Sequence, residues 1–228
     1  GIQDFEKIRQ GGFVYVDKTA LVYDLVSRGR IYFLSRPRRF GKSLLVSTLK
    51  YYFKGCKDLF KGLAIDSLER EWKEYPVFHF SFGTSNYTKS GSLDDVIEKY
   101  LSKYEEEYNI SSERKDYGLR LQDILRAAHK KSGRRAVVLI DEYDKPLLDV
   151  MNTGYKGMQN GQELPLEEIN RNILKGFYSV FKDADEDLQF VLLTGVTKFS
   201  QVSVFSGFNQ PDDISYDGRY DGLCGITK

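Results

Sequence analysis

The stretch "RPRRFGKSLLVSTLKYYF", residues 36–53, decides how the rest of the chain is interpreted. It follows a hydrophobic run, "RIYFLS", and leads into a segment with helical apolar spacing. At its centre, Gly41, Lys42 and Ser43 form the ending of a phosphate-binding loop, which faces an anion with backbone N–H groups and the positive end of a helix. In that arrangement Lys42 would reach the β- and γ-phosphates, and the Ser43 hydroxyl would bind Mg²⁺.

The first position of this loop departs from the general pattern, because Arg36 stands where a glycine normally eases the turn out of the strand. With Pro37 next, the turn needs a different backbone path. Arg38 and Arg39 add positive charge, and their guanidinium groups could supplement the backbone amides around a triphosphate. On these residues alone, a solvated basic turn before a core helix remains an open alternative.

A second motif, "RRAVVLIDEYDKP" at residues 134–146, places acids directly after a hydrophobic strand. Asp141 would reach Mg²⁺ through water or the loop serine, and Glu142 would orient and deprotonate the attacking water. Ligands of open α/β sheets bind at the carboxyl ends of the strands, so loop and acids would share an edge if their strands are parallel. Asp144 is a weaker candidate for the metal shell. Taken alone, the motif also fits a strand end with a solvated acidic turn.

A third element, "VLLTGVTKFS", is another buried strand that ends in small polar residues and Lys198. A cationic group at this position could lie near the γ-phosphate and sense hydrolysis. The alternative is a strand that leaves the sheet through a lysine-bearing turn.

Alternating apolar strands and amphipathic helices predict an α/β fold with right-handed crossovers. Nearly continuous apolar runs predict buried strands at residues 30–35, 76–82, 136–141 and 188–196. Helices are expected at residues 18–28, 43–53, 93–104, 119–131 and 166–181. We expect Asp17 and Ser92 to cap two of them, and Gly29 and Gly133 to end two. Three loops are expected at residues 81–92, 152–165 and 205–222.

The length and amino-acid composition of the chain predict one ordinary globular domain over residues 1–228. A net charge of +1 gives the whole molecule no strong attraction to nucleic acid or anionic membranes, although a local basic patch is compatible with it. No run approaches the roughly 18 apolar residues of a spanning helix, and the N-terminus lacks a signal-peptide core, which predicts a cytoplasmic protein without membrane contact. The chain starts without methionine and ends abruptly after "YDGLCGITK", so we expect part of a longer protein.

The cysteines and histidines give no sign of a metal centre. Cys56 and Cys224 lie far apart and are expected to be reduced thiols rather than a disulfide. His79 and His129 have no partners at ligand spacing, which argues against structural zinc. His79 lies in an apolar strand, where we expect a packed and hydrogen-bonded ring.

Taken together, these segments resemble the bacterial and archaeal AAA-ATPase-like family, within the P-loop ATPases that carry an additional strand between the two Walker motifs and a catalytic glutamate. The resemblance runs from "GIQDFEKIRQGGFVYVDKTALVYDLV" through "RPRRFGKSLL" and "VVLIDEYDKPL" to "LLTGVTKFSQVSVFSGFN". The arginine-rich loop is characteristic of that family, so Arg36 departs from the general pattern and not from the family's. The resemblance implies a P-loop NTPase three-layer sandwich, with a mostly parallel sheet covered by helices on both faces.

The resemblance also implies ATP and Mg²⁺ and assigns site residues. Ser43 and Asp141 would hold the metal. Glu142, Lys42 and Lys198 would be catalytic, with Lys198 as the sensor. The nucleotide would contact the run Arg38, Arg39, Phe40, Gly41, Lys42, Ser43 and Leu44. Family members often continue into a C-terminal nuclease-like domain, which residues 1–228 do not contain.

Two other functions stay open on the sequence. One is a slowly hydrolysing, nucleotide-regulated binding or signalling module, against which Glu142 argues because a pure binder needs no water-activating acid. The other is a DNA-associated ATPase partner of a nuclease domain, which the near-neutral charge weakens.

Overall fold

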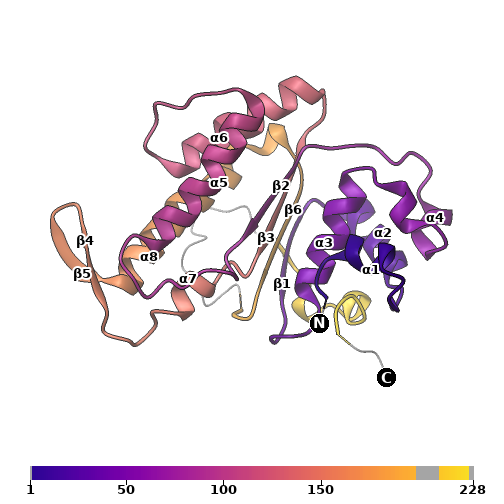
Figure 1. The fold of residues 1–228 in the computed structure, drawn as a ribbon, viewed down its shortest axis with the longest axis horizontal. Coiled ribbons are helices and arrows are strands. Elements are labelled where there is room, and N and C mark those ends of the chain that lie inside the picture. The colour runs from indigo at the N-terminus through magenta and orange to yellow at the C-terminus, as the bar shows by residue number, and fades with distance from the viewer. Residues whose placement is uncertain (1, 199–210, 226–228) are drawn as a thin grey trace.

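A five-stranded, entirely parallel sheet forms the centre of the protein (Figure 1). A computed structural model describes residues 2–198 and 211–225. The strand order is β2-β3-β6-β1-β7, so β1 and β3 are separated by β6. The bounds are β1 Ile31–Ser35, β2 Val77–Ser81, β3 Ala136–Asp141, β6 Leu188–Gly195 and β7 Asp212–Asp213. The four predicted strands are confirmed to within one residue at each end.

Helices cover both faces of the sheet, which confirms the predicted three-layer α/β sandwich (Figure 1). Successive strand residues point to opposite faces, as Phe33 and Leu34 do, and each belongs to a different core. One face packs against α1 Phe5–Gln10, α2 Thr19–Arg28, α3 Lys42–Phe53 and α4 Ala64–Leu68. The other packs against α5 Ser92–Tyr108, α6 Tyr117–Ser132, α8 Leu166–Tyr178 and α9 Val180–Asp183.

The helix ends correct several predictions. Helix α2 begins at Thr19, whose N–H donates to the Asp17 carboxylate at 2.9 Å, and ends before Gly29 in extended conformation. Ser92 is the first residue of α5 and not its cap, since the left-handed Gly91 precedes it. Gly133 ends α6 with φ 70°, as expected. The single helix predicted at residues 166–181 is two, because the chain leaves helical hydrogen bonding between α8 and α9.

Two predicted loops contain regular structure. Residues 152–165 include an antiparallel hairpin, β4 Lys156–Gln159 and β5 Gln162–Pro165. Its turn is Asn160-Gly161 with both φ angles positive, the most favoured two-residue hairpin turn. Residues 211–222 hold β7 and two short 3₁₀ helices, η5 Ile214–Tyr216 and η6 Gly218–Tyr220; the remainder of that predicted loop lies outside the described residues.

Three smaller elements complete the description. Helix α7 Lys145–Leu148 follows the acids after β3, and the 3₁₀ helices η1 Lys57–Phe60 and η2 Asp185–Asp187 connect larger elements. Cys56 and Cys224 are free thiols, as predicted. Within residues 2–198 and 211–225, no helix combines the length and apolar character needed to cross a membrane.

Tyrosine hydroxyls cover the free edge of β2, one of the two edge strands of the sheet. Tyr104 on α5 accepts the N–H of His79 at 2.9 Å and donates to the carbonyl of the same residue at 3.0 Å. Tyr100, one turn earlier, makes the same pair of contacts with Ser81 at 3.0 and 3.2 Å. Edge strands otherwise present unpaired backbone groups that invite another strand. These two side chains therefore close this edge of the sheet to strand pairing.

We expect Tyr104→Phe to destabilise the protein by roughly 1–3 kcal/mol, because it leaves one N–H and one carbonyl of β2 without their partner. Denaturant unfolding measures this change. Tyr108→Phe is the matched control, since the Tyr108 hydroxyl has no hydrogen bond to any described residue. Equal stability of the two variants would mean that solvent replaces the Tyr104 hydroxyl without cost.

Candidate functional site

The loop at residues 36–43 leaves the sheet at the carboxyl end of β1 and runs directly into α3. Ser35 is paired with Gly195 of β6, and Ile140 of β3 is paired with Leu193. The loop after β1 and the acids after β3 therefore meet at one edge, as predicted. Gly41, with φ 82°, makes the sharp entry into α3, a conformation that a side chain would strain.

Lys42 is buried at the start of α3 and turns back toward its own loop. Its ammonium group donates to the carbonyl oxygens of Arg36 at 2.8 Å and Pro37 at 2.9 Å. Burial lowers the pKa of Lys42, while the nearby carboxylates, Asp141 first, oppose that shift. The ammonium group therefore lies in a charged environment formed by the loop and by the acids after β3.

Asp141 is held in place by a side chain that the sequence analysis did not single out. The hydroxyl of Thr194, fully buried on β6, donates to Asp141 Oδ1 at 2.5 Å. Asp141 itself is only 5% exposed. The sequence predicted the place of Asp141, because it follows a hydrophobic run at the end of a strand. It did not predict the contact with Thr194, because that contact depends on β6 lying beside β3.

Glu142 has two unusual features for an acid beside a loop. Its φ angle is 55°, a left-handed conformation that costs energy in a non-glycine residue and that is common at functional sites. Its carboxyl group lies against Gly83, where an added Cβ would come within 3.0 Å of it. Burial raises the pKa of Glu142, and the Asp141 carboxylate adds to the increase. A carboxylate with a raised pKa is a suitable proton acceptor.

The carboxylate of Asp144 is buried and binds backbone N–H groups at the end of β6. Its Oδ2 accepts the N–H groups of Val196 at 3.0 Å and Thr197 at 2.6 Å, and the residue is 1% exposed. The carboxylate thereby fixes the chain where it leaves β6. Lys198 follows directly, with its ammonium group 5.2 Å from the centroid of the exposed Tyr216 ring.

Arg36 does not fill the role of the missing glycine. Its guanidinium group donates to the carbonyl oxygen of Ser215 and lies 3.8 Å from the Asp221 carboxylate. The side chain thus ties the start of the loop to the segment at residues 211–225. Arg38 and Arg39 are exposed, and Arg39 has φ 66°, so the turn uses a left-handed arginine.

One cavity of about 590 Å³ collects most of the predicted residues. Its wall contains three cationic side chains, from two arginines and a lysine, together with a serine hydroxyl and the carboxylate of a glutamate. The residues around it are Ile2, Gln3, Arg38, Arg39, Gly41, Lys42, Ser43, Leu44 and Glu142. Three predicted site residues do not line this cavity: Phe40, which is 44% exposed, the buried Asp141, and Lys198.

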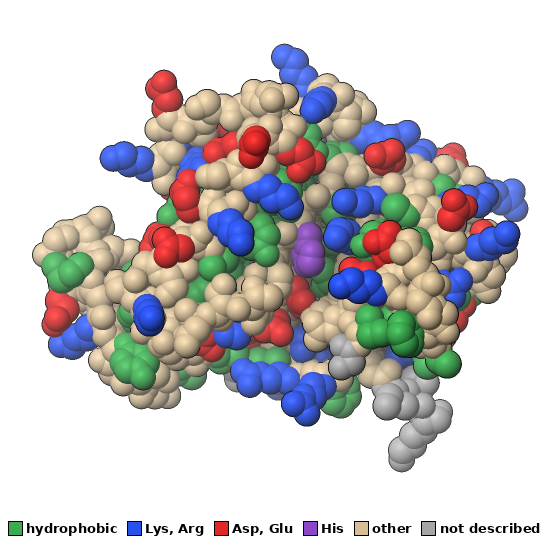
Figure 2. Space-filling model, viewed as in Figure 1, with side chains coloured by type: hydrophobic (Ala, Val, Ile, Leu, Met, Phe, Trp, Pro, Cys, Tyr) green, Lys and Arg blue, Asp and Glu red, His purple; other side chains and the backbone are tan. Residues whose placement is uncertain are grey.

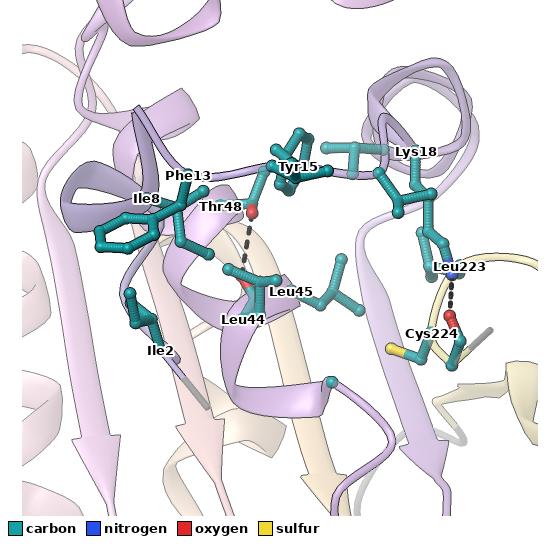
Figure 3. Close-up of a pocket in the computed structure, with 15 residues that line it drawn as sticks. Ile2, Ile8, Phe13, Tyr15, Lys18, Leu44, Leu45, Thr48, Leu223 and Cys224 are labelled. Carbon is teal, nitrogen blue, oxygen red and sulfur yellow. Dashed lines mark hydrogen bonds between the residues drawn. The ribbon is translucent and has the colours of Figure 1, made fainter. Parts of the chain in front are cut away.

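A second, apolar cavity of about 380 Å³ adjoins the first, since Ile2, Gly41 and Leu44 line both (Figure 3). Its other walls come from the N-terminal segment, α3 and residues 223–225. Lys18 joins two of these walls by donating to the carbonyl oxygen of Gly225. The sequence did not predict this cavity. The apolar run "FVYV" at residues 13–16, which lies outside the predicted helices and strands, could have indicated it; Val14 of this run is 93% exposed in the structure.

The fold and the residues at this edge of the sheet together indicate the class of protein. A parallel sheet with helices on both faces, a glycine-containing loop between β1 and α3, and acids after a nearby strand are consistent with a P-loop nucleoside triphosphatase. The chain belongs to the family described as predicted AAA-ATPase, which matches residues 1–205. A curated relative, named "Uncharacterized protein in vnfD 5'region", comes from Azotobacter chroococcum mcd 1. It is 43% identical over 232 residues; the match takes in 100% of this chain and 42% of the relative.

The chain thus spans less than half the length of this relative. That proportion indicates additional sequence in the relative beyond the matched region. It does not identify any further domain in the relative, and the expectation that residues 1–228 are part of a longer protein stays a prediction.

We expect Glu142→Gln to raise the stability of the nucleotide-free protein near pH 7. Because the folded-state pKa of Glu142 is raised, the folded protein binds this proton more tightly than the unfolded chain does. The ionised group therefore costs stability, and the cost grows as pH rises from the ordinary glutamate pKa through the raised one. Thermal unfolding of both proteins between about pH 4 and pH 8 should show a difference that disappears at the acid end.

Glu106→Gln is the matched control, since Glu106 is an exposed glutamate of α5. The interpretation of Glu142 would be wrong if its substitution lowered stability near pH 7, or if both variants changed stability equally.

Proposed function

We propose that this chain binds ATP with Mg²⁺ and hydrolyses it at the cavity between the 36–43 loop and Glu142. The observation that supports this most directly is the composition of the cavity wall: Lys42, Ser43 and two arginines face the same space as a carboxylate of raised pKa. Cations and a helix start suit a polyphosphate, and the carboxylate suits activation of water.

The phosphate chain would bind at the start of α3. Lys42 would exchange the carbonyl oxygens of Arg36 and Pro37 for phosphate oxygens, which compensate a buried ammonium group better than neutral acceptors do. Gly41 leaves the approach open, because the nearest heavy atom to an added Cβ lies 3.9 Å away.

The donor set fits a magnesium ion. Ser43 is the second residue of α3, next to Lys42, and Asp141 is the last residue of β3. The Ser43 hydroxyl and the Asp141 carboxylate are both hard oxygen donors of the kind that Mg²⁺ prefers. When bound, the ion would neutralise charge that develops on the phosphate oxygens. Thr194 would hold Asp141 in one orientation, which leaves its other carboxylate oxygen for the metal shell.

Glu142 would act as the general base. Its carboxylate would take a proton from the water that attacks the γ-phosphorus, and the proton would then leave with solvent or product. The strained backbone at Glu142 and the absence of a side chain at Gly83 both support a position selected for function over stability. Lys198 remains a proposed sensor of the γ-phosphate, and that role requires its ammonium group to leave the Tyr216 ring.

The apolar cavity would hold the nucleobase. It adjoins the phosphate cavity and offers apolar walls from two chain segments far apart in sequence (Figure 3). Aromatic bases suit a cavity of mainly apolar lining with a few polar groups, here Thr48 and Lys18. Binding there would bridge the N-terminal segment and residues 223–225.

The central prediction separates binding from hydrolysis. ATP with Mg²⁺ should raise the melting temperature by binding linkage, and Lys42→Ala should lose most of this increase. Glu142→Gln should keep the increase and lose turnover by a factor on the order of 10²–10⁴, as expected for a general base. Thermal-shift and phosphate-release measurements on the same preparations test both statements.

An equal thermal shift in Lys42→Ala would place the nucleotide elsewhere. Unchanged turnover in Glu142→Gln would assign the base to another residue, while binding without any turnover in the unsubstituted chain would favour a nucleotide-regulated binding module.

The arginines of the loop generate a separate prediction. We expect Arg38→Ala or Arg39→Ala to weaken ATP binding at least about tenfold, since a charge-assisted contact contributes roughly 1.5–3 kcal/mol and tenfold is about 1.4 kcal/mol. Titration calorimetry measures the affinity. Arg126→Ala, an exposed arginine of α6, is the matched control. If both single variants and the double variant bind ATP like the parent, the two arginines lie outside the site.

A further inference from the structure

A second anion-facing region lies on a different part of the molecule. A groove of about 1050 Å³ runs beside the edge strand β2, between α3 and α5, and continues to the end of α6. This volume reaches the upper limit of ordinary small-molecule pockets, which suggests an extended ligand. We call it the β2 groove. None of the residues that line it lines the two cavities at the 36–43 loop.

The β2 groove concentrates positive charge. Five cationic side chains line it, against the two carboxylates of Glu74 and Glu107. The cations are Lys50, Lys54, Lys103, Lys131 and Arg134. Figure 2 shows lysine and arginine side chains on both sides of the hollow at the centre of this face. The groove has an excess of three positive charges and the whole chain a net charge of +1, so the remaining residues together carry a net negative charge.

These cations are not neutralised by the protein. Within residues 2–198 and 211–225, none of the five forms an ion pair, whereas Arg120 on the neighbouring α6 pairs with both Glu98 and Glu105. The two acids that line the groove, Glu74 and Glu107, likewise form no ion pair within the described residues, so five cations share the groove with only two carboxylates. Unpaired cations that face each other across a groove repel, and an anion from outside would relieve that repulsion.

Three of the cations contact tyrosine rings that themselves line the groove. The ammonium groups of Lys103 and Lys131 lie 5.3 Å from the ring centroids of Tyr104 and Tyr108, respectively. The guanidinium group of Arg134 lies 5.5 Å from the centroid of Tyr75. Cation–π contacts of this length are attractive and reduce the freedom of long side chains. The charges are thus positioned before any ligand arrives.

His79 lies in the lining of the groove with an unused polar atom. Its Nε2 is buried and has no hydrogen-bond partner among the described residues, which corrects the expectation of a fully hydrogen-bonded ring. Burial lowers the pKa of His79; the Asp141 carboxylate opposes that shift, and the nearby lysines add to it. Buried nitrogens without partners are rare, and a ligand in the groove could supply the missing hydrogen bond.

The covered edge of β2 argues against a peptide ligand. A peptide would normally bind such an edge by adding a strand, through backbone hydrogen bonds. The hydroxyl groups of Tyr100 and Tyr104 already occupy those backbone groups at Ser81 and His79. What remains available is a cationic channel with aromatic walls, which is the composition of surfaces that follow an unpaired phosphodiester backbone.

We propose that the β2 groove binds single-stranded nucleic acid through its phosphates, independently of sequence and of the nucleotide at the 36–43 loop. The cations of α3 and α5 contact the backbone from opposite sides, and those at the end of α6 extend the contact along the strand. The near-neutral net charge of the chain conceals this surface, because acidic residues elsewhere balance it.

Fluorescence anisotropy with residues 1–228 and a labelled oligothymidylate of about 20 nucleotides, longer than a typical single-strand site, tests the proposal. Three to five phosphate contacts predict that log K falls with log salt at a slope of about −2 to −3.5. Lys42→Ala and saturating ATP with Mg²⁺ should leave the affinity unchanged. This result would show that the groove acts independently of the nucleotide site, whether or not ATP binds at the 36–43 loop.

The decisive variant carries Lys54→Glu, Lys103→Glu and Lys131→Glu, all exposed lysines of the groove. It should bind the oligonucleotide at least about tenfold more weakly and lose most of the salt dependence. The matched control carries Lys61→Glu, Lys175→Glu and Lys182→Glu, exposed lysines outside the groove, with the same change in net charge. Circular dichroism and melting temperature establish that both variants are folded.

Three results would overturn the proposal. One is equal loss in the groove variant and the control, which would indicate a general charge effect. Another is tighter binding of polyglutamate than of the oligonucleotide, which would indicate an acidic protein partner. The last is a duplex of the same length that binds as tightly as the single strand, which would contradict recognition of an unpaired strand.

Discussion

The parallel register of β1, β6 and β3 is the constraint on which the candidate site depends. It brings the carboxyl ends of the three strands to one edge, and so places Lys42, Thr194 and Asp141 together although they lie far apart in the sequence. A shift of β6 by one residue would turn Thr194 to the other face of the sheet and leave Asp141 without its partner. The chemistry at this edge therefore rests on strand order as much as on the residues themselves.

The same edge brings together features that oppose stability. Lys42 is buried, Glu142 has a left-handed backbone and a raised pKa, and Arg39 has a left-handed backbone as well. A chain selected only for stability would avoid these features, so their concentration at one place supports a functional role. Asp144 shows the contrast, because its buried carboxylate is satisfied by two backbone N–H groups.

The sequence predicted those parts of the fold that depend on local pattern. Nearly continuous apolar runs located four strands of the parallel sheet, and the strand–loop–helix context of Gly41 located the loop. What it did not predict depends on contacts between distant segments: the Thr194 partner of Asp141, the apolar cavity, and β7, which is only two residues long. The β4–β5 hairpin was missed for another reason. Its Asn160-Gly161 turn is a strong local signal, but its flanking strands have little alternating hydrophobicity.

Hydrogen–deuterium exchange with and without ATP and Mg²⁺ tests the central claim most directly, because it locates the nucleotide without any substitution. The account predicts slower exchange of backbone amides at residues 38–44, where the phosphates would bind, and at residues 13–18 and 223–225, which line the apolar cavity. Exchange along β2 and α5 should not change. Protection confined to the β2 groove, or no protection at residues 38–44 under conditions where ATP binds, would contradict the proposed site.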